Sequence, residues 1–237
     1  MTMKTPFTDG YDKTYLLETM MGPNAMRIME EMVDTLPIKP GMRVLDLGCG
    51  TGISSILLAQ KYDVSVFAAD LWIPPTENAQ RFARLELDEK IIPLLVDATK
   101  TIPFAHDYFD MIVSVDAYQY FGGNETMLAK LLPFVKTDGL IAVAVPGFTG
   151  DYTEGHLPEV VKPFWTPDWY FYSCSWWEAL WKKEPGIEIT QLREMDTCQQ
   201  AWDDFMECEM AQEMMVPIME AGAGEYFNII QLVGRKV

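Results

Sequence analysis

Three glycines follow an aspartate at alternate positions in the stretch "VLDLGCGTG", residues 44–52. An apolar run that stops at Asp46 is typical of a buried strand, and Gly48, Gly50 and Gly52 let the chain turn tightly into a following helix. Such a turn presents backbone N–H groups at a helix N-terminus. The stretch therefore predicts a site where a ligand comes close to the backbone.

Two further acids stand at the ends of apolar runs. Asp70 closes "VSVFAAD" and Asp97 closes "IIPLLVD". Carboxylates accept hydrogen bonds, which suits the hydroxyls of a ribose and the exocyclic amine of an adenine. Either acid could also cap a helix or stabilise a turn, but their shared position at strand ends favours a nucleoside ligand.

The elements that position these residues alternate along the chain. Short β-branched runs separated by helical patterns are found at 42–47, 64–70, 91–97, 109–116 and 140–145, and two more runs follow at 187–194 and 226–236. This alternation predicts parallel strands with right-handed crossovers. We therefore expect an α/β fold with a doubly wound, mostly parallel sheet.

The length of 237 residues fits a single domain, residues 1–237, with three additions. These are an N-terminal helical segment (1–38), a loop-like insertion with four prolines and three glycines (146–172), and a helical insertion (196–221). The helical insertion is expected to pack on the sheet, with Pro217 kinking its end, because apolar residues recur there every four positions, at Trp202, Met206, Met210, Met214 and Ile218.

The charge balance excludes some partners. Eighteen basic and 35 acidic residues give a net charge of −17, so we expect no nucleic-acid substrate. No signal-peptide core or membrane-length apolar run is present, which predicts a cytoplasmic protein without membrane contact. The four cysteines form no CxxC pair, so neither a disulfide framework nor a metal site is expected.

The spacing from Asp46 to Gly52 is DxGxGxG. It differs from the dinucleotide fingerprint GxGxxG, whose third glycine would stand at Ile53. The pattern resembles motif I of the class I (Rossmann-like) S-adenosylmethionine-dependent methyltransferases, in their small-molecule branch, and the resemblance extends through most of residues 40–145. It implies a seven-stranded sheet with an antiparallel last strand, helices on both faces, insertions after strands five and six, and S-adenosyl-L-methionine as cofactor.

The resemblance also implies roles for individual residues. The glycine loop would pack against the methionine portion of the cofactor, Asp70 would take the ribose hydroxyls, and Asp97 would face the adenine amino group. The N-terminal segment would form a lid that touches the cofactor through Tyr11 or Tyr15, or else an inert flank. The expected cofactor-binding residues are Tyr11, Asp46, Gly48, Gly50, Thr51, Gly52, Asp70, Leu71, Asp97, Ala98 and Val115.

Catalysis of methyl transfer can depend on positioning alone or on a general base. His156, in the loop after the fifth strand, is a candidate base, although it could be an ordinary loop histidine. Asp116, Tyr118 and Tyr120 follow the fourth strand and are candidates to reach the methyl group. The two tyrosines could instead be packing residues. The catalytic prediction is therefore His156, Asp116 and Tyr118.

Half of the segment 164–181 is aromatic. It could form a wall of the acceptor pocket or a dimer face, whereas Trp177 and Trp181, four residues apart, also fit a buried helix face.

The leading hypothesis is methyl transfer to a small-molecule acceptor by a monomer or homodimer. A protein methyltransferase and a non-catalytic S-adenosylmethionine-binding protein are the alternatives. The sequence does not identify the acceptor or the atom that is methylated.

Overall fold

The computed structural model describes residues 5–100 and 102–237. Its strands form one sheet in the order β3-β2-β1-β4-β5-β7-β6, in which β7 runs antiparallel to β5 and β6, and the strands from β3 to β5 run parallel. The expected doubly wound sheet with an antiparallel last strand is confirmed. The strands are β1 (Arg43–Leu47), β2 (Ser65–Asp70), β3 (Ile91–Leu95), β4 (Phe109–Val115), β5 (Val135–Phe148), β6 (Ile187–Glu194) and β7 (Phe227–Lys236).

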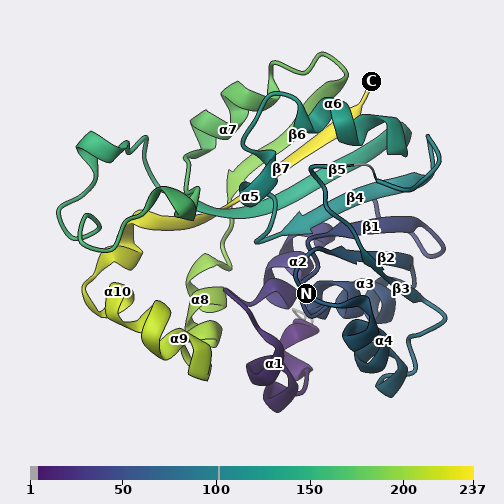
Figure 1. Cartoon of the computed structure of the whole chain (residues 1–237), viewed down its shortest axis with the longest axis horizontal. Coiled ribbons are helices and arrows are strands. Elements are labelled where there is room, and N and C mark those ends of the chain that lie inside the picture. The colour runs from purple at the N-terminus through teal and green to yellow at the C-terminus, as the bar shows by residue number, and fades with distance from the viewer. Residues whose placement is uncertain (1–4, 101) are drawn as a thin grey trace.

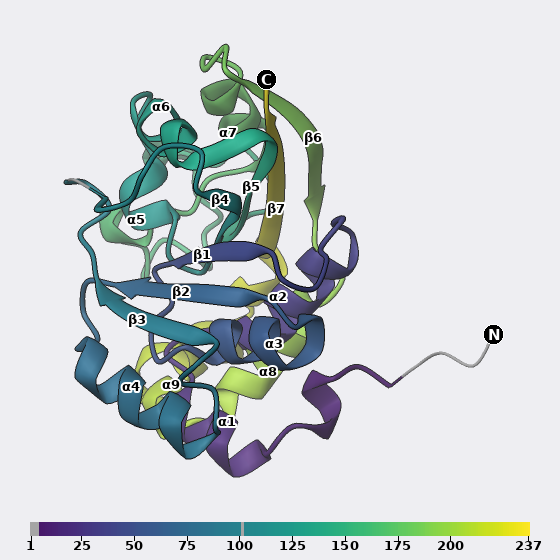
Figure 2. The ribbon, with the colours of Figure 1, turned by 90° about the vertical axis from the view of Figure 1, so that its right-hand side faces the viewer.

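Helices cover both faces of the sheet (Figures 1 and 2). One face packs against α2 (Ala25–Asp34), α3 (Ile53–Tyr62), α4 (Pro75–Arg84) and α8 (Cys198–Met206), with α1 (Lys13–Thr19) at its margin. The other face carries α5 (Gln119–Gly122), α6 (Met127–Leu131) and α7 (Cys174–Trp181). The remaining helices are α9 (Glu209–Met214), α10 (Val216–Glu220) and short 3-10 turns at Thr8–Gly10, Leu132–Phe134, Glu154–His156, Pro167–Trp169 and Ala223–Tyr226.

Alternation along the strands divides the core into two layers. Val44 and Val66 point into the layer beneath α2 and α3, whereas Leu45 and Phe67 point into the layer beneath α6 and α7. Successive side chains of a strand face opposite sides of a sheet, so near-continuous apolar runs are what a strand buried on both faces requires. The two layers fix the parallel strands from both sides and therefore fix where their carboxyl ends lie.

Several helices begin where the sequence carries a start signal. Pro75 occupies the first turn of α4, where its missing N–H group costs no helical hydrogen bond. Asn24 caps α2 by accepting a hydrogen bond from the backbone N–H of Met26, and Ser173 caps α7 in the same way. These caps satisfy backbone donors that the first helical turn leaves free.

The helical insertion 196–221 differs from the expected continuous helix. The chain breaks at Cys208 and at Met215, so three short helices follow one another. The breaks interrupt the four-residue repeat: Trp202 and Ile218 are buried, but Met210 and Met214 are 48% and 57% exposed. The prediction of one apolar stripe is therefore wrong for these two methionines, and Pro217 begins α10 instead of kinking a longer helix.

The aromatic segment 164–181 divides between two cores. Trp177 and Trp181 are buried in the layer beneath α7, which confirms the packing alternative for these two residues. Trp169 and Phe171 join a third, smaller core around Phe148, beside α10. The insertion 146–172 therefore has apolar packing of its own, and its first residues extend β5.

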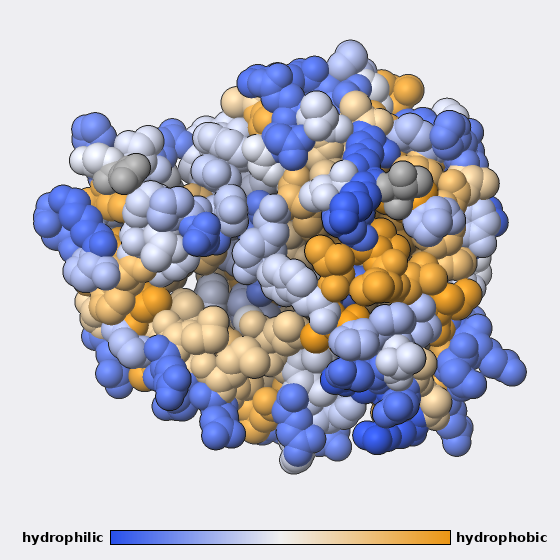
Figure 3. Space-filling view, in the orientation of Figure 1, coloured by the Kyte–Doolittle hydropathy of each residue, from blue (hydrophilic) through white to orange (hydrophobic). Residues whose placement is uncertain are grey.

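The face of the molecule seen in Figure 1 gathers apolar residues over the parallel half of the sheet, with hydrophilic residues around the rim (Figure 3). Across residues 5–100 and 102–237, the helices are all too short or too polar to pass through a bilayer.

Candidate active site

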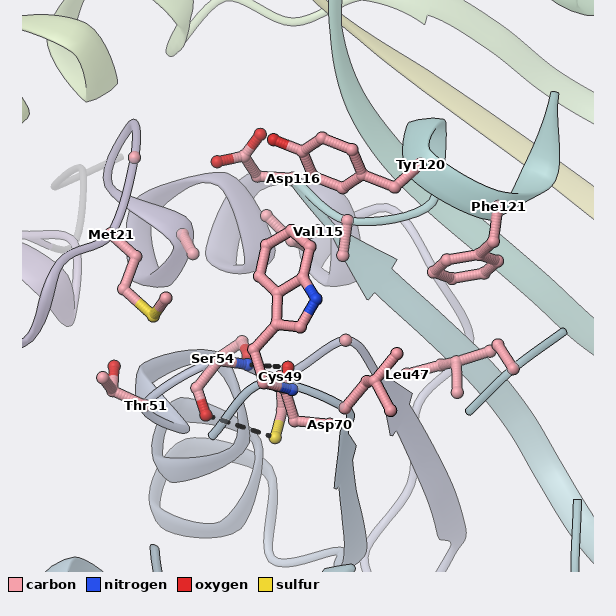
Figure 4. A pocket seen from close by; sticks show the side chains of 18 of the residues that line it. Met21, Leu47, Cys49, Thr51, Ser54, Asp70, Val115, Asp116, Tyr120 and Phe121 are labelled. Atoms are coloured by element: carbon pink, nitrogen blue, oxygen red, sulfur yellow. Dashed lines mark hydrogen bonds between the residues drawn. The ribbon is translucent and has the colours of Figure 1, made fainter. Parts of the chain in front are cut away.

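A cavity of about 290 Å³ opens at the carboxyl ends of the parallel strands. In Figure 4, side chains from the N-terminal segment, from the turn after β1 and from the residues after β2 and β4 surround the same space. The lining residues are Thr19, Met21, Gly22, Pro23, Ala25, Leu47, Gly48, Cys49, Gly50, Thr51, Ile53, Ser54, Asp70, Leu71, Trp72, Val96, Asp97, Ala98, Thr99, Val115, Asp116, Ala117, Tyr120 and Phe121.

The glycine turn forms the floor of this cavity with a left-handed backbone. Gly48 has φ +78° and Gly50 has φ +54°, a region that residues with a side chain rarely adopt. A Cβ at Gly48 would lie 2.3 Å from the Cβ of Ala117. A Cβ at Gly50 would lie 3.2 Å from the sulfur of Met21, closer than an ordinary contact, so the absence of a side chain lets Met21 pack against the turn. Glycine at both positions therefore allows close approach.

Asp70 holds the turn in place. Its Oδ2 accepts a hydrogen bond from the backbone N–H of Gly50 at 2.8 Å, and its Oδ1 accepts from those of Trp72 and Ile73 at 2.7 and 2.9 Å. Asn78 of α4 donates from Nδ2 to the carbonyl of Gly50 at 2.9 Å. Because a carboxylate has about four acceptor sites, Asp70 supports the turn and still has room for a ligand hydroxyl.

Asp46 supports the site without lining it. The side chain is fully buried, and its Oδ2 accepts hydrogen bonds of 2.6 Å from the hydroxyls of Ser54 and Ser55, which fixes the start of α3. Burial raises the pKa of Asp46 to about 6, against the lowering effect of the two hydroxyls. Gly52, at φ +87°, likewise precedes α3 outside the lining, and the buried Cys49 has a pKa raised well above its ordinary value by burial.

Other predicted cofactor residues lie around the same cavity. Thr51, Leu71, Asp97, Ala98 and Val115 all contribute to its lining. The Oδ1 of Asp97 accepts from the backbone N–H of Thr99 at 2.9 Å, and its Oδ2 lies 3.1 Å from the Nζ of Lys100. The hydrogen bonds from Thr99 and Lys100 lower the pKa of Asp97, which keeps it an acceptor.

Asp116 is the carboxyl group on the opposite wall. Its backbone lies in the left-handed region at φ 51°, and its backbone N–H donates a hydrogen bond to the carbonyl of Ala144 at 2.9 Å. Its Oδ1 accepts from the Nε2 of Gln119 at 3.0 Å, and a Cβ at Gly22 would lie 2.2 Å from its Oδ2. Burial raises the pKa of Asp116 to about 7. This carboxyl can therefore exchange a proton near neutral pH.

Three predicted residues are not brought to the cavity. Tyr118 is 1% exposed and packs between Trp177 and Trp181, so the structure corrects its assignment as a catalytic residue. His156 is exposed, with its Nδ1 3.2 Å from the hydroxyl of Thr153, and does not line the cavity. Tyr11 lines a second cavity of about 300 Å³ between the N-terminal segment and α8. Each of these side chains belongs to a different surface or core.

Several lining residues were not predicted from the sequence. Thr19, Met21 and Gly22 come from the N-terminal segment, which is tied to the glycine turn by the hydroxyl of Thr51 donating to the carbonyl of Thr19 at 2.6 Å. The Gly-Pro pair at 22–23 marks a turn, and it is the signal that could have singled out this segment. Trp72 and Phe121 had no signal beyond their nearness to Asp70 and Asp116.

Comparisons with known proteins agree with this geometry. Residues 44–139 match the profile of a methyltransferase domain, and residues 4–68 match that of protein-L-isoaspartate(D-aspartate) O-methyltransferase. The chain is 32% identical over 133 residues to 2-methyl-6-phytyl-1,4-hydroquinone methyltransferase from Synechocystis sp. (strain ATCC 27184 / PCC 6803 / Kazusa), covering 56% of this chain and 38% of that protein.

Solved structures share the fold at low sequence identity. A geranyl diphosphate methyltransferase in complex with SAM has a TM-score of 0.69 at 15% identity, over 90% of this chain and 85% of that one. Phosphoethanolamine N-methyltransferase 2 of Haemonchus contortus, in complex with S-adenosyl-L-methionine, has a TM-score of 0.72 at 18% identity, over 95% of this chain and 57% of that one.

The matched profile and the strand order together define the class of the protein. Residues 44–139 match a methyltransferase domain, and the chain has the class I, Rossmann-like methyltransferase fold, in agreement with the resemblance noted in DxGxGxG. It spans less than half the length of the curated relatives that it matches.

Proposed function

We propose that the protein transfers a methyl group from S-adenosyl-L-methionine to a small-molecule acceptor. The observation that carries this proposal is the convergence of the glycine turn, Asp70, Asp97 and Asp116 on one cavity at the carboxyl ends of the strands. In open α/β sheets this edge is where ligands bind. The named acceptors of the solved neighbours are small molecules, which supports the same substrate class.

The residues present fit this cofactor. Gly48 and Gly50 line the cavity with backbone alone, and the carboxylates of Asp70 and Asp97 provide acceptors for ribose hydroxyls and for an adenine amine. Ala98, Leu71 and Val115 supply apolar contact. When bound, the cofactor supplies a sulfonium methyl group: the acceptor's lone pair forms the bond to the methyl carbon, and the electrons of the broken carbon–sulfur bond stay on sulfur.

The chain's own contribution is positioning, water exclusion and proton acceptance. Met21 and Phe121 lie on opposite sides of the cavity (Figure 4), where their apolar side chains reduce the room for water beside the reacting atoms. Asp116 follows β4 beside Val115 and can take the proton that an acceptor hydroxyl or amine releases. We assign catalysis to Asp116, and we keep no role there for Tyr118 or His156.

The N-terminal segment acts as a lid in this proposal. Five residues of this segment line the cavity: Thr19, Met21, Gly22, Pro23 and Ala25. Arg27 joins the segment to the helical insertion through its ion pairs with Asp9 and Asp204, at 2.7 and 2.8 Å. Residues 1–4 of the expected lid lie outside the described residues. A lid that encloses the cavity favours a small acceptor. We expect the protein to act in the cytoplasm as a monomer or homodimer. Its net charge of −17 disfavours the binding of nucleic acid.

A protein methyltransferase is the second candidate, because residues 4–68 match the isoaspartate methyltransferase profile. That match ends within β2 and leaves out Asp97, Asp116 and Tyr120. Incubation with labelled cofactor and either a metabolite panel or denatured protein separates the two. Label in protein alone would select the second candidate.

Cofactor binding tests the proposal directly. Calorimetric titration is expected to show that the protein binds S-adenosylhomocysteine. Asp70→Asn is expected to weaken this binding by about 1 to 3 kcal/mol, the scale of lost charge-assisted hydrogen bonds. Asp88→Asn, an exposed acid in the turn before β3, is the matched control and should bind like the wild type. Tight NAD binding without S-adenosylhomocysteine binding would overturn the assignment.

A further inference from the structure

The charged groups around the cavity all carry one sign. Asp70, Asp97 and Asp116 line it, and among the lining residues that the structure describes there is no lysine, arginine or histidine. Asp70 is occupied by three backbone N–H groups, and Asp97 pairs with Lys100, whose side chain is 80% exposed. An anionic acceptor would lose hydration here without gaining a cationic partner.

Among the three lining acids, Asp116 is the one whose carboxyl group accepts no hydrogen bond from a backbone N–H group or a lysine of the described residues. Its side-chain hydrogen bond comes from the neutral amide of Gln119. The N-terminal segment faces it with Gly22, and α5 faces it with Tyr120, whose hydroxyl is the titratable group nearby. Burial and the charge of Asp116 raise the pKa of Tyr120 to about 12, so this phenol remains neutral. The Asp116 carboxylate is therefore free to hold a cation.

Aromatic rings stand next to this carboxyl group. Trp72 is 64% exposed and Tyr120 is 47% exposed, although both line the cavity, and their ring centroids lie 5.3 Å apart. Tyr170, from the insertion after β5, extends the group with its ring centroid 6.0 Å from that of Tyr120. Aromatic faces attract ammonium groups, and large exposed rings at a cavity mouth are available to a ligand.

We propose that the acceptor is an amine, held through its ammonium group by the carboxylate of Asp116 and the rings of Trp72 and Tyr120, and that the cavity rejects acceptors bearing phosphate or carboxylate groups. This inference rests on the proposed function and names its substrate class. The net charge of −17 acts in the same direction, because a negative field raises the local concentration of cations.

The same arrangement accounts for the proton of the reaction. An ammonium group must release one proton before its nitrogen lone pair can form a bond to a methyl carbon. Asp116 accepts that proton on its Oδ2, the oxygen that has no hydrogen bond from Gln119, and returns it to solvent after the product leaves. The carboxyl group thus binds the acceptor first and acts as its base afterwards.

A matched pair of probes tests the charge preference without methyl transfer. Tyramine and 4-hydroxyphenylacetate share a phenol ring and differ in the sign of their charged end. Calorimetric titration into protein saturated with S-adenosylhomocysteine is expected to give tyramine an affinity at least about tenfold higher. Asp116→Asn and, separately, Trp72→Ala should remove most of this preference, whereas Asp88→Asn should retain it.

The outcomes separate this inference from the proposed function. Equal binding of the two probes, tighter binding of the carboxylate, or no tyramine binding by protein that binds S-adenosylhomocysteine would overturn the amine assignment and leave the methyltransferase proposal standing. If Asp116→Asn weakens S-adenosylhomocysteine while the tyramine preference persists, Asp116 serves the cofactor and the assignment fails. Wild-type protein that does not bind S-adenosylhomocysteine would overturn the proposed function itself.

Discussion

The floor and the wall of the cavity are built in different ways. On the floor, both backbone groups of Gly50 have partners in the protein: its N–H donates to Asp70, and its carbonyl accepts from Asn78. On the wall, Asp116 has one side-chain hydrogen bond and a raised pKa, and Trp72 and Tyr120 are largely exposed. Protein groups take up most of the hydrogen-bonding capacity of the floor, and Asp70 keeps about one acceptor site for a ligand hydroxyl. The wall has capacity left for a ligand, which is where specificity and proton transfer are expected to reside.

The two regions meet at one close contact. A Cβ at Gly48 on the floor would lie 2.3 Å from the Cβ of Ala117, which directly follows Asp116 on the wall. A change at this contact should disturb the fold and the site together, whereas changes confined to one region should affect one property.

Asp116→Asn should lower kcat by about 10²- to 10⁴-fold with an acceptor that must lose a proton, since this is the usual contribution of a general base. The wild-type rate should fall as the pH drops below about 7, because protonated Asp116 cannot accept a proton. The variant should lose this dependence. Turnover measured from pH 5.5 to 8.5 provides the check, and superimposable profiles would remove Asp116 from the chemistry.

Gly48→Ala should lower the free energy of unfolding by about 2 to 4 kcal/mol. The left-handed backbone at φ +78° costs a residue with a side chain about 1 to 2 kcal/mol, and the clash with Ala117 adds to this. Urea unfolding measures the loss. Gly155→Ala is the control, because nothing lies within 4 Å of a Cβ there. Equal stability of the two variants would contradict the contact between floor and wall.

The buried carboxyl group of Asp116 should cost stability above neutral pH. The pKa of Asp116 is raised from about 4 in the unfolded chain to about 7 in the native state. Between these two pH values the native state binds more protons than the unfolded state, so the free energy of unfolding falls as the pH rises from about 4 to about 7. Asp116→Asn removes this cost. The variant should be more stable than the wild type by about 1 to 3 kcal/mol at pH 8, with little difference near pH 4. A pH-independent difference in urea unfolding would argue against the shift.

His156→Ala should change turnover less than about twofold, because this exposed histidine does not line the cavity. The measurement is kcat with the same acceptor used for Asp116→Asn. A loss comparable to that of Asp116→Asn would mean that the insertion after β5 moves onto the cavity during catalysis.

The floor could be predicted almost completely from the sequence. Asp70 and Asp97 are predicted at strand ends because an apolar run stops at each of them, and the structure ends β2 at Asp70 and β3 shortly before Asp97. Away from the floor, β6 is found at the residues predicted for it. β5 is longer than expected, at Val135–Phe148, because its pairing with β7 continues into the insertion. The pairing of β5 with β7 joins residues about 80 to 95 positions apart in the chain. The hydrophobic pattern within a short stretch of sequence does not reveal such pairing.

The sequence by itself determined the fold class, the glycine turn and the acids at the strand ends, since these depend on hydrophobic periodicity and backbone conformation within short windows. Only the tertiary structure decided which neighbouring side chains face the ligand. Tyr118 and Tyr120 are two residues apart at the start of a helix, where the helical rotation points them in nearly opposite directions, one into the core and the other to the cavity. Met21 and Trp72 lie far from Asp116 in the chain but line the same cavity, and the pKa of Asp116 is raised by a burial that exists only in the folded structure.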